Sequence, residues 1–216
     1  MSDSCPDDET LQRPQLLAQH LARLRAGGRP QDLWLFAYGS LIWRPEIEVA
    51  EQQLARVRGY HRALRMQSRL YRGTPEQPGL VLALLSGGSC QGLLYRVAAA
   101  QAEAALRQLW AREMVTGVYE PRWLRCHGAL GEQRALAFTL SRRSSHLTGP
   151  LDEGQLLQVF RHAQGRYGST LDYLQRTVLS LRGHGIRDRE LERQYHLAAS
   201  HGLCEPLRES VGQGGG

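Results

Sequence analysis

The sequence predicts an α+β domain, because segments with strand character come first and segments with helical spacing dominate the end of the chain. Apolar runs without helical periodicity recur between residues 33 and 140. An amphipathic helix near residues 102–113 interrupts them, and three further helical stretches follow near 152–164, 169–182 and 187–200. At 216 residues the chain is long enough to bury one core without disulfides or a structural metal.

The first strand is expected from Leu33 to Tyr38, an apolar and aromatic run that stops at Gly39 and Ser40. Glycine lets the backbone approach a ligand closely, and a turn of this kind can direct amide N–H groups at an anion. An ordinary strand end is the alternative interpretation, and spacing alone favours it. The turn becomes a candidate binding site only when other chemical groups accompany it.

A second extended segment is expected around residues 54–66, and two hairpins follow it. The Ser-Gly-Gly-Ser run at 86–89 lies between two apolar runs and is typical of a chain reversal. The predicted hairpins pair residues 79–85 with 92–97, and residues 122–126 with 135–140.

The helix near 102–113 has the clearest pattern in the chain. Its apolar positions recur at i, i+3, i+4, i+7 and i+8, and they are Ala102, Ala105, Leu106, Leu109 and Trp110. The next position on the same face is Glu113, a carboxylate where the stripe predicts an apolar side chain. Thr116 and Gly117 are expected to end this helix.

The three later helices carry their own start and stop residues. Asp152 and Ser169 are plausible N-caps, because their side chains can accept hydrogen bonds from the first free N–H groups. Glycines at 165, 183 and 202 are expected to end these helices. The run 165–168 lacks the Gly-Lys-Ser/Thr ending of a phosphate loop and is interpreted as a linker between helices.

The ends of the chain differ from its middle. Residues 1–31 are expected to form an N-terminal helical extension, in which Pro14 opens a helix that Gly27 and Gly28 end. Residues 32–202 are expected to form the main domain. The Gly-rich stretch 203–216 is expected to be a flexible tail.

The net charge of +6 raises the possibility of a nucleic-acid partner. All 27 basic residues are arginines and there is no lysine or asparagine, a bias that indicates codon usage more than selection for phosphate binding. The arginines are also scattered, whereas a nucleic-acid surface usually forms a stripe with interleaved aromatic residues. A pocket for a small anionic substrate is therefore favoured, and no nucleic-acid partner is expected.

Metal, membrane and export signals are not expected in this chain. The four cysteines include no Cys-x-x-Cys pair and no histidine at ligand spacing, so no metal site is predicted. No window approaches the ~20 apolar residues of a membrane span. Because the first residues are polar and acidic, unlike a secretory signal, a cytoplasmic location is expected.

Glu113 is the strongest candidate for a catalytic group. It falls on the buried face of its helix and in the last turn, where both burial and the negative end of the helix dipole raise a carboxyl pKa. A carboxylate tuned upward in this way can accept a proton near neutral pH. The alternative is that Glu113 only forms an ion pair with Arg112 or Arg122 at the helix end.

Several segments in order along residues 33–200 resemble the ChaC family of glutathione-specific γ-glutamylcyclotransferases, and the spacing after Glu113 resembles its bacterial branch. One such motif would be a weak signal, whereas six in register are strong. The matching segments are Tyr38-Gly39-Ser40-Leu41, Tyr71-Arg72-Gly73-Thr74-Pro75-Glu76-Gln77-Pro78-Gly79, Gly92-Leu93-Leu94-Tyr95-Arg96, Arg112-Glu113-Met114-Val115-Thr116-Gly117-Val118-Tyr119, Thr148-Gly149-Pro150-Leu151 and Asp172-Tyr173-Leu174.

The resemblance implies a γ-glutamylcyclotransferase-like fold, a mixed β-barrel or sheet with flanking helices spanning residues 32–202. It also implies a cofactor-free, lyase-type enzyme that converts glutathione to 5-oxoproline and Cys-Gly. Glu113 matches the catalytic acid/base. The implied substrate-binding residues are Tyr38, Gly39, Ser40, Leu41, Arg72, Tyr119 and Tyr173, of which Arg72 has a surface loop arginine as its alternative.

Other functions stay open at this point. The same reaction on γ-glutamyl amino acids or amines is one, and a non-catalytic protein that binds a γ-glutamyl ligand is another. An arginine-rich nucleic-acid binder is the third, and it predicts retention on DNA or RNA that depends steeply on salt. The oligomeric state is not predicted.

Overall fold

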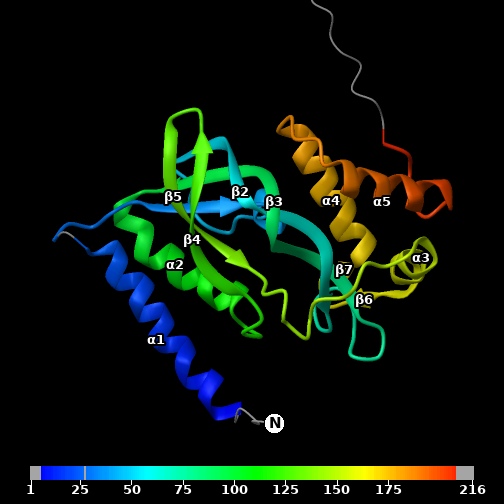
Figure 1. The fold of residues 1–216 in the computed structure, drawn as a ribbon, viewed down its shortest axis with the longest axis horizontal. Helices are drawn as coiled ribbons and strands as arrows, with labels where there is room; N and C mark the ends of the chain where they lie inside the picture. Colours follow the sequence, from blue (N-terminus) through cyan, green and yellow to red (C-terminus); the bar gives the residue numbers. More distant parts are fainter. Residues whose placement is uncertain (1–5, 27, 208–216) are drawn as a thin grey trace, which may run out of the picture. The chain divides into compact units, whose positions relative to one another are not determined.

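The computed structural model describes residues 6–26 and 28–207 (Figure 1). Its contacts divide the chain into two compact units, one made of the residues up to 63 with 82–147, the other of 64–81 with the residues from 148 onward. The elements in chain order are α1 (Pro6–Leu24), β1 (Leu33–Ala37), η1 (Ser40–Ile42), β2 (Glu51–Ser68), β3 (Gly79–Val97), α2 (Ala99–Glu113), β4 (Glu120–Gly128), β5 (Gly131–Thr139), α3 (Glu153–His162), β6 (Gln164–Gly165), β7 (Gly168–Ser169), α4 (Thr170–Gly183) and α5 (Arg189–Ser200).

Five strands form a closed barrel in the order β1-β3-β2-β4-β5. β1 pairs antiparallel with β3, and it closes the barrel through a parallel pairing with β5 at Leu35 and Leu136. Both of these leucines are fully buried, because inward positions of a small barrel are filled by side chains. The predicted α+β class and the mixed barrel with flanking helices are confirmed.

The hairpin predicted around residues 86–89 is wrong. β3 runs without reversal from Gly79 to Val97, and Gly87 and Gly88 lie within it with φ values of 98° and 75°. Two left-handed glycines can form a tight hairpin turn, but they can also bend a strand that continues. The carbonyl of Gly87 contacts the ring of His61 on β2, so the glycine pair is held beside a neighbouring strand.

β2 is longer than the predicted segment 54–66, and its inward-facing positions change at Gly59. Ala55 and Val57 are buried before this residue, whereas Arg62 and Leu64 are buried after it. A glycine with a positive φ of 80° interrupts the strict alternation of side chains between the two faces. The change in alternation places an arginine, Arg62, on the inward face.

The second predicted hairpin is confirmed. β4 and β5 pair antiparallel over their whole length, down to Gly128 opposite Gly131. Only two residues form the turn, so the two strands extend beyond the predicted segments 122–126 and 135–140 toward each other. Gly131 has a φ of 96°, which a side chain would disfavour in so short a loop.

Helix α2 is confirmed, and its whole predicted stripe of apolar residues is buried. α2 contacts β1 and α1, so its buried face covers one part of the barrel unit.

α1 begins at Pro6, so the prediction that Pro14 opens the helix is wrong, and Pro14 lies inside it. Proline suits the first helical position at Pro6, because its missing N–H has no partner there. Of the predicted helix end, Gly27 lies outside the described residues.

The second unit contains α3, α4 and α5, which contact one another. Asp152 and Ser169 cap α3 and α4 as predicted, each accepting a hydrogen bond from a backbone N–H three residues later. α3 ends at His162, before the expected Gly165. The run 165–168 forms the turn of a short hairpin between β6 and β7, so its interpretation as a plain helix linker is wrong.

The domain boundaries at residues 31 and 202 stay predictions. Residues 208–216 of the expected tail lie outside the described residues, as do residues 1–5 of the extension. None of the described helices combines the length and the hydropathy that a bilayer crossing requires.

Candidate active site

The turn that follows β1 forms a short 3₁₀ helix, η1, directly after Gly39. Its first internal hydrogen bond runs from the N–H of Ile42 to the carbonyl of Gly39. The N–H groups of Ser40 and Leu41 precede that bond, and such groups at a helix start lack an intrahelical partner. The turn can therefore present two neighbouring N–H donors to an oxygen atom.

Two features hold the end of β1 in place. The guanidinium of Arg62 donates to the carbonyl of Tyr38 at 2.9 Å and also to the carbonyl of Gln91 on β3. Next to Gln91, a Cβ atom on Gly92 would lie 2.4 Å from the carbonyl oxygen of Ala37, so only glycine permits this approach of β3 to β1. The Tyr38 turn is thus fixed by one buried arginine and one close backbone contact.

Glu113 is the last residue of α2, and its side chain is 13% exposed. Burial raises the pKa of its carboxyl above the ordinary value; the neighbouring Arg112 opposes this shift and the carboxylate of Glu46 adds to it. The structure therefore supports the predicted upward shift of the Glu113 pKa. The predicted ion pair also exists, since Nε of Arg112 lies 3.0 Å from the carboxylate, while Arg122 pairs with Glu120 instead.

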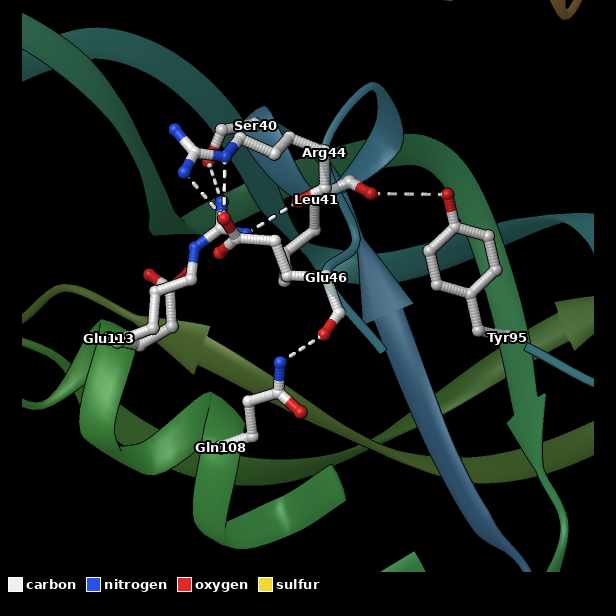
Figure 2. Close-up of polar contacts among 8 residues, drawn as sticks. Ser40, Leu41, Arg44, Glu46, Tyr95, Gln108 and Glu113 are labelled. Carbon is white, nitrogen blue, oxygen red and sulfur yellow. Dashed lines mark hydrogen bonds and ion pairs between the residues drawn. The ribbon is translucent and has the colours of Figure 1, made fainter. Parts of the chain in front are cut away.

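Arg112 joins Glu113 to the turn. Its guanidinium donates to the hydroxyl of Ser40 at 2.9 Å and to the carboxylate of Glu46 at 2.9 Å, in addition to its contact with Glu113 (Figure 2). It also donates to the carbonyl of Arg44. One side chain therefore links the last turn of α2 with η1 and with the loop that follows it.

The aromatic residues near the turn are also held by hydrogen bonds. The hydroxyl of Tyr38 donates to the carbonyl of Phe138 at 2.7 Å, and the ring of Tyr119 meets the ring of Phe138 edge-on. Tyr95 donates its hydroxyl to the carbonyl of Leu41 at 3.2 Å (Figure 2). Phe138 thus connects Tyr38 with Tyr119, and Tyr95 supports the backbone of η1.

Arg72 and Tyr173 belong to the second unit and contact each other there. The guanidinium of Arg72 lies 5.3 Å from the centre of the Tyr173 ring and donates to Asp172 at 2.7 Å. With 7% of its side chain exposed, Arg72 is not the surface loop arginine of the alternative interpretation. Although burial of Asp172 raises its pKa, hydrogen bonds from Arg176 and Arg72 outweigh it, so the pKa of Asp172 lies below its ordinary value.

The predicted site residues thus fall into two groups. Within the barrel unit, the structure connects Ser40 with Glu113 through Arg112, and Tyr38 with Tyr119 through Phe138. Within the second unit it connects Arg72 with Tyr173.

Glu46 and Arg62 were not predicted as site residues. A sequence signal existed for Arg62, because it shares the alternation of Leu64 and Met66, which are buried further along the same strand. For Glu46 the sequence carries no such signal, since its importance lies in its contacts with Arg44 and Arg112.

Among residues 6–26 and 28–207, no cluster of three or more His, Cys, Asp or Glu side chains is arranged to hold a metal ion. The described cysteines Cys90, Cys126 and Cys204 are free thiols, and burial raises the pKa of Cys126 to about 12. A thiol with so high a pKa is a poor nucleophile at neutral pH. The role of Glu113 as the acid/base stays a prediction.

Comparison with known proteins identifies the family. The family model described as ChaC-like protein matches residues 33–199, which is most of the chain. The chain belongs to the ChaC-like family. This ChaC-like protein carries the predicted motifs inside the matched range, from the Tyr38 turn to the Asp172-Tyr173 segment.

Two curated relatives illustrate the similarity. This ChaC-like protein is 35% identical over 151 residues to the glutathione-specific γ-glutamylcyclotransferase of Escherichia coli, covering 68% of this chain and 64% of the relative. It is 32% identical over 174 residues to the human glutathione-specific γ-glutamylcyclotransferase 1, covering 77% of this chain and 78% of the relative. The match thus spans slightly less than two thirds of the bacterial relative's length.

A solved structure shares the fold of this ChaC-like protein. The crystal structure of a γ-glutamyl cyclotransferase specific to glutathione from yeast superimposes with a TM-score of 0.70 at 17% sequence identity. The superposition covers 79% of this chain and 96% of the yeast chain. At 17% identity this similarity shows that the two proteins share a fold, the barrel with its helices.

Proposed function

We propose that this protein is a γ-glutamylcyclotransferase that converts glutathione to 5-oxoproline and Cys-Gly. The observation that carries the proposal is the buried carboxylate of Glu113, joined through Arg112 to the turn at Ser40. Two curated relatives named for this activity support the choice of substrate. The reaction needs no oxidant, water or metal, because the attacking amine and the scissile amide belong to the same molecule.

Glu113 acts as general base and then as general acid in this proposal. The α-ammonium of the γ-glutamyl group must lose a proton before its nitrogen can attack the γ-carbonyl carbon. Glu113 takes that proton, the new C–N bond closes the five-membered ring, and the bond to the cysteine nitrogen breaks. Glu113 returns the proton to the cysteine nitrogen as that bond breaks, and the second proton lost by the ring nitrogen completes the ammonium group of Cys-Gly. A raised pKa suits both steps, since the proton must be accepted and returned near neutral pH.

The turn after β1 is assigned to the developing oxyanion. Negative charge grows on the γ-carbonyl oxygen during ring closure, and the N–H groups at Gly39, Ser40 and Leu41 are the donors proposed to meet it. Tyr38 and Tyr119 are assigned to the substrate pocket because both lie in segments that match the family motifs. Contact of Arg72 and Tyr173 with the substrate stays a prediction, because Asp172 already binds the Arg72 guanidinium.

The proposal is tested by incubating the protein with reduced glutathione and following 5-oxoproline and Cys-Gly by mass spectrometry. We expect Glu113→Gln to retain the fold and glutathione binding while turnover falls roughly 10²-fold to 10⁴-fold, the usual contribution of general acid/base catalysis. Glu132→Gln, an exposed change of the same kind, serves as the control. A Glu113→Gln variant that keeps most of its activity would exclude Glu113 from the reaction.

Turnover of γ-Glu-Ala measured alongside distinguishes the rival functions. Cyclisation of γ-Glu-Ala without cyclisation of glutathione would move the assignment to γ-glutamyl amino acids or amines. Binding of either compound without any product would favour a non-catalytic binding protein. The cytoplasmic location and the absence of a nucleic-acid partner stay predictions, and salt-dependent retention on DNA would contradict the second of them.

A further inference from the structure

Glu46 has an unusual backbone conformation. It is the one residue other than glycine with a positive φ among the described residues, at 54°. Side chains with a β-carbon adopt this left-handed region at a cost, and such residues concentrate at functional sites. A glycine at this position would adopt the same conformation freely. The reason for a glutamate must therefore be sought in its side chain.

The polar groups of Glu46 bind the loop after η1 to two successive turns of α2. Its carboxylate accepts a hydrogen bond from Arg112 at 2.9 Å, and its backbone carbonyl accepts one from the side chain of Gln108 (Figure 2). Residues four apart on a helix lie on the same face, so Gln108 and Arg112 form a pair of anchors for one loop residue. Arg44 adds a third contact, with its Nε 2.6 Å from the Glu46 carboxylate.

Arg112 consequently lies between two acids. Its guanidinium contacts the carboxylates of Glu46 and Glu113 and also donates to the hydroxyl of Ser40. A positive charge beside a carboxyl stabilises the ionised form and lowers its pKa. The negative charge of Glu46 offsets this effect of Arg112. Glu113 therefore keeps a precise position relative to the turn without losing the basicity that burial provides.

We propose that Glu46 is a positioning residue for Glu113, which fixes the Arg112 guanidinium and balances its charge. The inference rests on the proposed function, because it assigns Glu46 a part in the same proton transfer. The charged groups that surround Glu113 in this arrangement are Arg112 on its own helix and, from the loop after η1, Glu46 and its partner Arg44. Of these, Glu46 acts to raise the pKa of Glu113 and Arg112 acts to lower it.

Two substitutions separate the charge of Glu46 from its backbone. Glu46→Gln keeps the size of the side chain and removes the charge. Glu46→Gly removes the side chain and relieves the left-handed strain, so it suits the turn at least as well as glutamate does. If Glu46 only forms the turn, both variants behave as the parent protein. If it balances Arg112, both lower the pKa of Glu113. Glu48→Gln, the same charge change at an exposed position two residues away, is the matched control.

The experiment titrates the Glu113 carboxyl by ¹³C NMR in protein labelled at glutamate, with the signal assigned by its loss in Glu113→Gln. We expect the midpoint to move to lower pH in both Glu46 variants and to stay in place in Glu48→Gln. The acidic limb of the kcat/KM profile for glutathione should move in the same direction. The value of kcat/KM at neutral pH should fall roughly tenfold as Arg112 loses its fixed position.

An unchanged Glu113 midpoint in either Glu46 variant would overturn the inference, even if activity fell. A shift of the same size in Glu48→Gln would overturn it too, because the effect would then be general. Absence of glutathione turnover by the parent protein would count against the proposed function instead, while the NMR titration would still decide the role of Glu46.

Discussion

At the scale of single residues, Glu113 lowers the unfolding free energy of the protein at pH values where its carboxyl is ionised. Burial raises its pKa in the folded state above the ordinary value of about 4.3, so the folded protein binds the proton more tightly than the unfolded chain does. The unfolding free energy therefore decreases as the pH rises through the folded-state pKa, and is highest below the unfolded-state pKa. The carboxylate proposed as the acid/base is therefore retained at a cost in stability.

We expect Glu113→Gln to be more stable than the parent protein at pH 7 to 8, with the difference vanishing near pH 4, where the parent carboxyl is protonated as well. Thermal unfolding at several pH values measures this. Each kcal/mol of difference appears as a Tm change of about 2–4 °C in a chain of this size. The exposed change Glu48→Gln should not reproduce the trend. Equal stability of parent and Glu113→Gln at every pH would contradict the buried, raised-pKa description.

The sequence was sufficient to find Glu113, because a carboxylate that continues a buried stripe conflicts with the helical pattern. It was also sufficient to place a turn at Gly39 and Ser40, since a strand must end there. The arrangement around Arg112 could not be predicted in the same way. Its partners Ser40 and Glu46 lie 72 and 66 residues away along the chain, and no local pattern encodes contacts of this range; only the ion pair with its neighbour Glu113 was open to prediction.

At the scale of the elements, a buried histidine contributes to the attachment of α1. His20 is 8% exposed and its Nδ1 accepts a hydrogen bond from the indole of Trp123 on β4 at 2.8 Å. Its ring also contacts the ring of Trp110 on α2. Burial, with a smaller contribution from Arg23, lowers the pKa of His20. The hydrogen bond requires a neutral imidazole, because a protonated ring has no acceptor for the indole N–H.

We expect the attachment of α1 to weaken as the pH falls below about 6.5, the ordinary histidine pKa, because the unfolded chain then binds a proton that the folded state resists. Thermal unfolding between pH 7 and pH 5 should show a steeper loss of stability in the parent protein than in His20→Gln. A glutamine can still accept from the indole but does not titrate. His196→Gln, at an exposed position, should behave as the parent. Parallel pH dependence in the parent and His20→Gln would refute this account.

The helices were easier to predict than the strands. Helix spacing, caps and stop residues are local, and α2, α3, α4 and α5 all lie close to the predicted ranges. The strands depend on which neighbour they meet. Gly87 and Gly88 could end a strand or bend it, and only the presence of β2 alongside decides between the two. In the same way, the change of facing at Gly59 means that alternation counted from Val57 misses the inward position of Arg62, whereas alternation counted back from Leu64 finds it.

At the scale of the whole molecule, binding of substrate should raise the stability of the folded state. A ligand that binds only the folded protein adds about 2.7 kcal/mol at a concentration of one hundred times its Kd. We expect reduced glutathione to raise the Tm of Glu113→Gln, in which the complex accumulates because turnover is slow. At that concentration the rise should be about 5–11 °C in a chain of this size. γ-Glu-Ala serves as the comparison ligand.

A Tm that does not respond to glutathione would show that Glu113→Gln has lost binding as well as turnover. Glu113 would then be needed to hold the substrate, and its assignment as a pure acid/base would fail. A larger response to γ-Glu-Ala than to glutathione would instead change the proposed substrate.

Neither compact unit is a continuous piece of the chain. The segment 64–81 lies in the middle of the barrel sequence but has its partners in the residues from 148 onward. Gly79 in this segment fits against a residue made much later, since a Cβ on Gly79 would clash with Thr170 as well as with Arg72. During synthesis from the N-terminus, this segment cannot make these contacts until the residues from 148 onward have been made. The second unit therefore completes its folding only after the residues from 148 onward have been made, and neither unit can be obtained by a single truncation.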